Sequence, residues 1–459
     1  MNLRLPVMAA LAFALALSAC APVPPVSVSA RQTGFSEPLP AMRSFTTARA
    51  RPSLRGNRQL AADFLELSFE LESGRKIPRL TRFEGEIPIE LRGPASPVLR
   101  RDLDRLMARL RREAGLPVRA VRTGEAGAII VEVIPGRDLR RAVPQAACFV
   151  VPRVRGWEDF RRSRRSGKVD WTTLERRESA SVFLPGDVSP QEARDCLHEE
   201  IAQALGPLND LYRLPDSVFN DDNFHTVLTG FDMLMLRVTY DRALRNGMSR
   251  AEVAALLPGI LARLNPRGER AGPPPVPQTP HIWTEAMGHA LNPRGPDAFR
   301  RAQARRAVDL ANAAGWRDTR MGFSLYAYGR LALNRTPEEA LAAFVDAANI
   351  YGAQPDTQIQ AAHVTVQLAA FSLSGREAAT TLRLIDHSLP AVREAENAAL
   401  LSTLMLMRAE ALDLLGRGRE ARAERSEALG WARYGFGSDA AVRDRAGEIA
   451  ALAPAPAGG

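Results

Sequence analysis

The residues with the clearest chemical potential lie in one short stretch, Glu199-Glu200-Ile201-Ala202-Gln203-Ala204-Leu205-Gly206-Pro207-Leu208-Asn209. Glu200 carries a carboxylate that can act as a general base, and Glu199 can offer oxygen to a metal ion. Gln203 follows Glu199 by four residues, so the two side chains share one face of a helix. The stretch therefore predicts a metal-dependent site or the remnant of one.

Both ends of the helix that must carry this stretch are marked in the sequence. Ser189 is followed by Pro190 and, three positions on, by Glu192, which is a typical capped helix start. Gly206 and Pro207 end the periodic run, because glycine favours a helix end and proline cannot continue one. We therefore expect a helix between Ser189 and Gly206.

The stretch resembles the His-Glu-x-x-His-x-x-Gly-x-x-His helix of the metzincin zinc peptidases. In that comparison Glu200 matches the general base and Gly206 the turn glycine, while the three ligand positions hold Glu199, Gln203 and Asn209. Amides are weak ligands, so the resemblance implies a catalytically degenerate domain without a cofactor or metal. The alternative is an unusual periplasmic peptidase or amidase that uses Glu200 as general base and binds a divalent metal weakly.

More of the chain follows the same resemblance. The turn 216–219 stands where metzincins have a Ser-Ile-Met-type turn under the metal, and 228–241 resembles their last helix. Residues 57–265 are also similar to a family of exported bacterial proteins catalogued as domain of unknown function 2927. The resemblance implies an α+β fold, a metzincin-like zincin domain with a mixed sheet and the motif helix.

Other acidic residues and histidines near the motif allow a different site. Asp210, Asp216 and the pair Asp221-Asp222 could add oxygens to a hard-cation site, although turn formation and helix capping explain them as well. A lone histidine is more often a structural residue than a ligand, so we expect His198 and His225 to be structural.

The elements around the motif are predicted from periodicity and end signals. Residues 83–91 alternate as a strand, with Pro88 typical of an edge, and two more strands are expected at 127–134 and 181–184. Ser96 and Pro97 start a helix that runs to Gly115, and 60–71 is a further helix.

An apolar run at the N-terminus ends with Leu17-Ser18-Ala19-Cys20. These four residues resemble the bacterial lipobox. The resemblance implies a signal peptide over 1–19 and a lipid on Cys20 that anchors the protein to a membrane. Residues 20–56, rich in proline at the start, predict a flexible tether. Ala21 follows the cysteine and favours sorting of the exported protein to the outer membrane. The protein would then face the periplasm.

Composition agrees with a folded body of two or three domains. The chain has 459 residues, of which 46% are hydrophobic and 25% charged, and a formal net charge of +9. Lys occurs only at 76 and 168, so nearly all positive charge is Arg. Export argues against a nucleic-acid partner.

A basic and aromatic stretch at 153–171 predicts either a phosphate site or a solvated loop.

Cys148 and Cys196 are the only cysteines besides Cys20. In an oxidising compartment two such thiols predict a disulfide.

A proline-rich linker at 266–283 separates a second, wholly helical domain at 284–452, and 453–459 is a disordered tail. New helices are expected to begin within 334–340, 374–378 and 416–421, a spacing near that of helical-hairpin repeats, and residues 421–429 resemble tetratricopeptide packing. Such repeats bind partner proteins, here a protein of the envelope. A plain helical bundle is the alternative.

Overall fold

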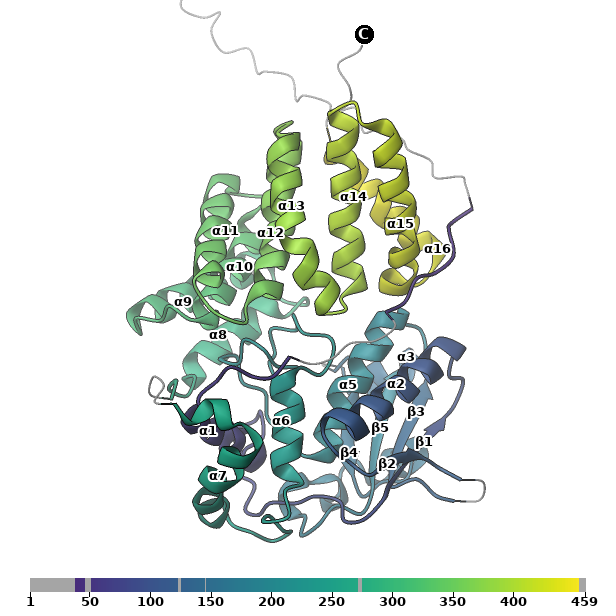
Figure 1. Ribbon diagram of the computed structural model, residues 1–459, viewed down its shortest axis with the longest axis vertical. Helices are drawn as coiled ribbons and strands as arrows, with labels where there is room; N and C mark the ends of the chain where they lie inside the picture. Colours follow the sequence, from purple (N-terminus) through teal and green to yellow (C-terminus); the bar gives the residue numbers. More distant parts are fainter. Residues whose placement is uncertain (1–37, 46–50, 123–124, 145, 271–274, 454–459) are drawn as a thin grey trace, which may run out of the picture.

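The computed structural model describes residues 38–45, 51–122, 125–144, 146–270 and 275–453. A five-stranded mixed sheet with surrounding helices forms the N-terminal part, and a run of helices forms the rest (Figure 1). The predicted α+β class, followed by an all-α region, is confirmed. The expected signal peptide and Cys20 lie outside the described residues.

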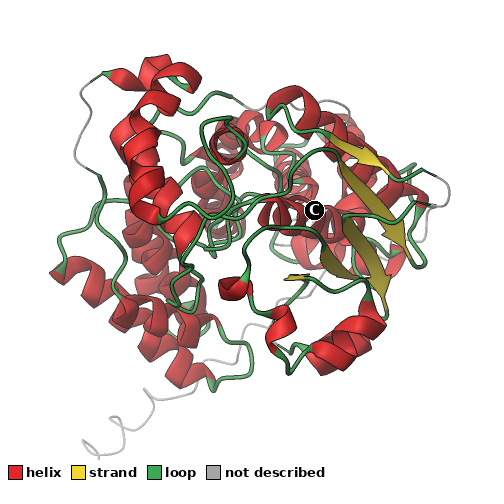
Figure 2. Cartoon of the chain, turned by 90° about the horizontal axis from the view of Figure 1, so that it is seen from below, coloured by secondary structure: helices red, strands yellow, loops and turns green. Residues whose placement is uncertain are grey.

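The sheet has the strand order β2-β1-β3-β5-β4. All neighbouring strands are parallel except β4, which pairs antiparallel with β5 at one edge. Figure 2 shows these strands gathered on one side of the molecule. The strand bounds are Ile87–Arg92 for β1, Val118–Ala120 for β2, Ile129–Ile134 for β3, Phe149–Pro152 for β4 and Ala180–Pro185 for β5.

The expectation that Pro88 marks an edge strand is wrong, because β1 lies between β2 and β3. The proline is tolerated because pairing with β3 begins only at the next residue, Ile89, which aligns with Ile129. Pro88 still contributes its carbonyl, which accepts a hydrogen bond from Ala128 N at 2.8 Å. The missing N–H therefore removes no bond of the β1–β3 ladder.

Helices cover both faces of the sheet. Side chains alternate along β5, so Val182 and Leu184 enter the main core while Phe183 faces a smaller aromatic cluster with Phe149 and Phe160. The main core lies under α2 (Pro97–Glu113) and α5 (Pro190–Leu205). The other face carries the short elements α3 (Gly136–Ala142), α4 (Trp157–Ser163) and η1 (Gly167–Val169), while Trp171 of η2 (Trp171–Thr173) packs against the main core.

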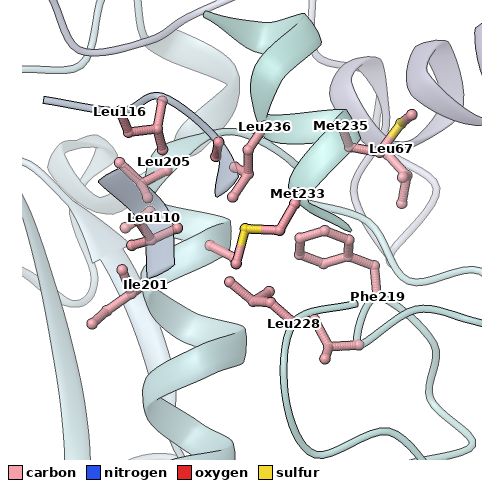
Figure 3. Close-up of a cluster of buried hydrophobic side chains, with 14 of the residues drawn as sticks. Leu67, Leu110, Leu116, Ile201, Leu205, Phe219, Leu228, Met233, Met235 and Leu236 are labelled. Carbon is pink, nitrogen blue, oxygen red and sulfur yellow. The ribbon is translucent and has the colours of Figure 1, made fainter. Parts of the chain in front are cut away.

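The main core continues into three helices beside the sheet. These are α1 (Asn57–Phe69), α6 (Gly230–Thr239) and α7 (Arg250–Leu264), followed by the short turn η3 (Pro266–Glu269). Figure 3 shows Leu110 of α2, Ile201 of α5 and Met233 of α6 converging in this core. α2 begins as predicted, since the Ser96 hydroxyl accepts a hydrogen bond from Leu99 N at 3.1 Å.

The disulfide expected from the sequence is confirmed. Cys148, just before β4, is bonded to Cys196 in the middle of α5, with Cα atoms 6.0 Å apart. The bond ties the antiparallel edge strand to the helix that carries the motif.

A long segment without helix or strand, 206–229, connects α5 to α6 and is held by buried charges. Arg213 donates hydrogen bonds to both Asp63 and Glu66 of α1. Arg55 donates to Asp63 at 2.9 Å and to Asp216 of the segment. Because these groups are almost entirely buried, each charge needs its partner to compensate for lost hydration.

The helical region is a series of antiparallel pairs, in which α10 packs with α11, α12 with α13, and α14 with α15. Helices begin where the sequence predicts them, at Pro337, Ala378 and Gly418. The bounds are α8 His281–Leu291, α9 Asp297–Ala313, α10 Thr319–Ala332, α11 Pro337–Gly352, α12 Gln358–Ser374, α13 Ala378–Glu394, α14 Ala398–Leu414, α15 Gly418–Phe436 and α16 Asp439–Ala450.

The two parts meet through specific polar contacts at the start of α5. Gln191 donates to Asn397 at 3.0 Å, and Arg194 donates to the carbonyl of Glu396 at 2.7 Å. Tyr434 of α15 donates to the buried Asp102 of α2 at 2.7 Å. The helical region is therefore fixed to both helices that cover the sheet.

Part of the expected tether also lies against the helical region. Arg43 N donates to the carbonyl of Gly430 at 2.9 Å, and the Phe45 ring stacks on Trp431 with centroids 4.5 Å apart. Residues 38–45 thus run along α15.

Removing the disulfide should destabilise the N-terminal part. Closing a loop of 48 residues contributes about 4 kcal/mol in the chain-entropy model, so Cys148→Ser/Cys196→Ser should lower the free energy of unfolding by up to that amount. Denaturant unfolding with and without reductant measures the effect. Reductant should destabilise the parent and leave the double variant unchanged; a parent insensitive to reduction would contradict the role of the bond.

Arg213→Ala should cost about 3 to 5 kcal/mol, because it leaves Glu66 and part of Asp63 buried without a cation. The matched control is Arg161→Ala, which breaks an exposed pair with Glu158 and should cost less than about 1 kcal/mol. Urea unfolding of both variants gives the comparison. Equal losses would show that the buried pairs do not hold the segment.

Candidate functional site

The motif helix α5 is built as its end signals predict. The Ser189 hydroxyl accepts a hydrogen bond from Glu192 N at 3.2 Å. At the other end the buried Arg177 guanidinium donates to the carbonyls of Gln203, Ala204 and Gly206, each at 2.6 Å. These carbonyls have no partner inside the helix, so Arg177 satisfies them and complements the helix dipole. Burial lowers the pKa of Arg177 to about 10.

The three residues at the ligand positions of the metzincin comparison have different surroundings. Glu199 is half-buried, and Gln203 and Asn209 are buried. The Asn209 amide donates to the carbonyl of Glu66 at 3.3 Å, and its oxygen accepts from Asp210 N at 3.1 Å. Asn209 therefore uses its side chain to hold the backbone of segment 206–229 against α1.

Glu200, at the position of the general base, is 5% exposed. Its Oε2 has no hydrogen-bond partner among the described residues. Burial raises the pKa of Glu200 well above its usual range, and the charges of Glu199 and Glu72 add to the rise. Burial, followed by the charge of Asp221, also raises the pKa of Glu199, to about 8.

The histidines near the motif are structural, as expected. His198 Nδ1 accepts a hydrogen bond from Leu228 N at 3.0 Å, and burial holds its pKa well below the usual value. His225 Nε2 lies 2.9 Å from the carbonyl of Pro215, and burial lowers its pKa to about 4. Both rings are bound to backbone groups, so neither is available beside Glu200.

Three carboxylates meet next to the motif helix, and we call them the carboxylate cluster: Glu72, Asp210 and Asp221. One oxygen of each lies within 4.8 Å of the other two. Within the described part of the chain this is the only group of His, Cys, Asp or Glu side chains close enough to share a metal ion.

The backbone of segment 206–229 brings two members of the cluster together. Leu211 N donates to the carbonyl of Phe219 at 2.9 Å, which closes the segment so that Asp210 and Asp221 face each other. Glu72 comes from the tight turn after α1, where Gly74 has a φ of 76°. Such a φ is readily adopted by glycine, and the turn points back toward the segment.

The sequence identified part of this cluster. Asp210 and Asp221 were grouped as possible oxygen ligands, while Glu72 was missed because nothing local distinguishes it from other acidic surface residues. Asp216 and Asp222, which belonged to the same group, lie elsewhere. Asp216 pairs with Arg55, and Asp222 accepts a hydrogen bond from Phe224 N at 3.1 Å, the turn role that the sequence also allowed.

Segment 206–229 also packs into the helical region. The Tyr212 ring lies edge-on to Trp283, with centroids 5.1 Å apart, and packs on Phe323. Phe224 contacts Phe323 and Tyr326. The segment that carries two of the clustered carboxylates is therefore held by charges on one side and by aromatic rings on the other.

Most of the basic stretch 153–171 lies on the face of the sheet opposite α5, but its last residue, Trp171, packs against the Arg177 guanidinium at 4.9 Å. Several of its cations are paired, for example Lys168 with Asp159 at 2.8 Å and Arg161 with Glu158 at 3.0 Å. Arg153 donates to Thr173 Oγ1 at 3.0 Å. These contacts agree with a solvated, internally paired segment.

Among the described residues, no helix combines the length and the apolar character needed to cross a membrane. No curated protein matches the chain. A family model described as "Protein of unknown function (DUF2927)" matches residues 57–259, which include the sheet, the motif helix and the carboxylate cluster. Residues 57–259 are therefore similar to the DUF2927 family, and the helical region follows them in the chain.

Proposed function

We propose that this protein is a lipid-anchored binding or scaffolding module of the bacterial cell envelope, and that its DUF2927 domain is a catalytically degenerate relative of the metzincins. One observation carries the proposal. The side chain at the third ligand position, Asn209, donates a hydrogen bond to the backbone carbonyl of Glu66 and accepts one from the backbone N–H of Asp210. In the metzincin motif that position holds a histidine whose imidazole faces the metal.

The surroundings of the motif support the comparison with zincins. The turn 216–219, compared above with the turn under the metal, is bonded to α6 through Asp232. That carboxylate accepts hydrogen bonds from Ser217 Oγ at 2.6 Å and from Val218 N at 3.2 Å. The turn is thus fixed to the first turn of α6.

The helical region supports the binding role. Five large apolar side chains are exposed on α8, α9 and α11, namely Ile282, Leu291, Phe299, Leu341 and Val345. Leu341 and Val345 are one turn apart on α11, so they share one face of the helix. Exposed apolar groups on paired helices are typical of surfaces that bind another protein.

The second candidate is a hydrolase that uses Glu200, and the unpartnered, buried carboxyl of that residue favours it. A general base, however, has to be ionised before it can accept a proton. Burial raises the pKa of Glu200 well above its usual range, so the ionised form that a general base needs is disfavoured. The surroundings of Glu200 therefore favour the binding role over the hydrolase.

Purified protein supplied with Zn²⁺ should retain less than one zinc per chain and cleave no member of a general peptide library. Glu200→Gln and the exposed control on the same helix, Glu192→Gln, should both behave like the parent. Metal analysis and mass spectrometry of the library measure these outcomes. Stoichiometric zinc, or cleavage that is lost in Glu200→Gln and kept in Glu192→Gln, would favour the hydrolase.

Lipidation is tested by labelling cells with a radioactive or clickable fatty acid. Cys20→Ser should abolish the label, because the cysteine sulfur is the proposed acceptor. Cys148→Ser is the matched control, since it also removes one cysteine, and it should keep the label. Label that persists in Cys20→Ser would exclude the anchor.

A further inference from the structure

Five carboxylates come close together where α5, the turn after α1 and segment 206–229 meet. They are the carboxylate cluster, Glu72, Asp210 and Asp221, together with Glu199 and Glu200 of the motif helix. None of the five forms a salt bridge with an Arg, Lys or His in the described ranges. Like charges this close favour the protonated carboxyl, which raises the pKa of Glu199, Glu200, Asp210 and Asp221, unless a cation is bound.

The distances within the cluster fit one divalent ion. Calcium ligands lie 2.3–2.6 Å from the ion, so oxygens on opposite sides of it are about 4.6 to 5.2 Å apart. The oxygens of Glu72, Asp210 and Asp221 all lie within 4.8 Å of one another. Three oxygens from three parts of the chain can therefore reach one ion without rearrangement of the backbone.

Glu200 gives an independent indication of a missing ligand. Its Oε2 is buried without any hydrogen-bond partner, and a buried oxygen without a partner is costly in a folded protein. Glu200 lies close enough to Glu199 and Glu72 for their charges to act on it. Its carboxyl therefore lies near Glu72, a member of the carboxylate cluster, where a cation would compensate it.

The chemistry of the donors decides which cation fits. All of them are carboxylates, which zinc uses less readily than imidazole and thiolate. Magnesium keeps several waters and usually takes one or two carboxylates, whereas calcium accepts six to eight oxygens in flexible geometry. The partly exposed position of Glu72 leaves room for water molecules to complete the coordination.

We propose that Glu72, Asp210 and Asp221 bind a calcium-type divalent cation beside Glu199 and Glu200 of the motif helix. The site goes beyond the proposed envelope-binding function and does not depend on it. The ion would link the end of α1 to segment 206–229, next to the aromatic contacts with the helical region. It would therefore stabilise the junction of the two parts.

Terbium luminescence tests the site in the purified full chain after removal of metals with EDTA. Tb³⁺ replaces Ca²⁺ in oxygen sites and emits when nearby aromatic rings are excited. Tyr212 hydrogen-bonds to Asp221, and Trp283 packs on Tyr212, so both rings lie close to the proposed ion. We expect emission that saturates at one Tb³⁺ per chain and is displaced by Ca²⁺.

The variants Asp210→Asn and Asp221→Asn remove one ligand charge each while keeping the shape of the side chain. Each should weaken Ca²⁺ binding by at least about 10- to 100-fold, which is the loss expected when a residue that only supports a metal ligand is removed. Asp309→Asn, which removes an exposed carboxylate paired with Arg305 on α9, should bind like the parent.

Thermal unfolding separates loss of the site from loss of the fold. Without metal, Asp221→Asn should melt at the same temperature as the parent or higher, because the substitution relieves repulsion. Ca²⁺ should raise the melting temperature of the parent and of Asp309→Asn, and leave that of Asp221→Asn unchanged.

Three outcomes would overturn the proposal. They are emission that Ca²⁺ does not displace, equal binding by the parent and both cluster variants, and preference for Zn²⁺ over Ca²⁺.

Discussion

The burial of Arg213 between Asp63 and Glu66 is the interaction on which the arrangement of this molecule depends. Segment 206–229 has no regular secondary structure, so its shape must come from contacts with neighbouring elements. The cation pulls the segment onto α1, and Arg55 extends the same network to Asp216. Buried ions tolerate little displacement because each depends on its partner, so the network fixes the segment in one conformation.

The conformation of segment 206–229 determines which residues it contacts on each of two sides. On one side Tyr212 and Phe224 enter the core of the helical region, which joins the two parts through apolar contact. On the other side Asp210 and Asp221 are left beside α5 without a cation from the protein. The same segment therefore joins the domains and creates the concentration of negative charge that we assign to a calcium-type ion.

Features set by local sequence were predicted well. The starts of α2 and α5 follow from a serine that caps the helix and a proline after it, and the disulfide follows from the cysteine count and expected export. The position of Pro88 was misjudged because strand order is decided by tertiary packing.

The site itself was only partly predictable. The motif helix and two of the clustered aspartates stand out in the sequence. Glu72 does not, because it lies 138 positions before Asp210 and only the fold of α1 against segment 206–229 brings them together. Arg177 was missed for the same reason: its role as a cap of α5 depends on a contact between distant parts of the chain.

If the proposed lipid anchor is present, the contact of residues 38–45 with α15 limits how far the folded part can lie from a membrane. With a lipid on Cys20, the chain from residue 20 to residue 38 can span at most about 60 Å when fully extended. The segment contacts α15 at Gly430 and Trp431, and the Phe45 carbonyl accepts a hydrogen bond from Arg105 of α2 at 2.6 Å. A lipid on Cys20 would then hold the protein at the place where α2 and α15 meet, so that both parts would be tied to the lipid surface.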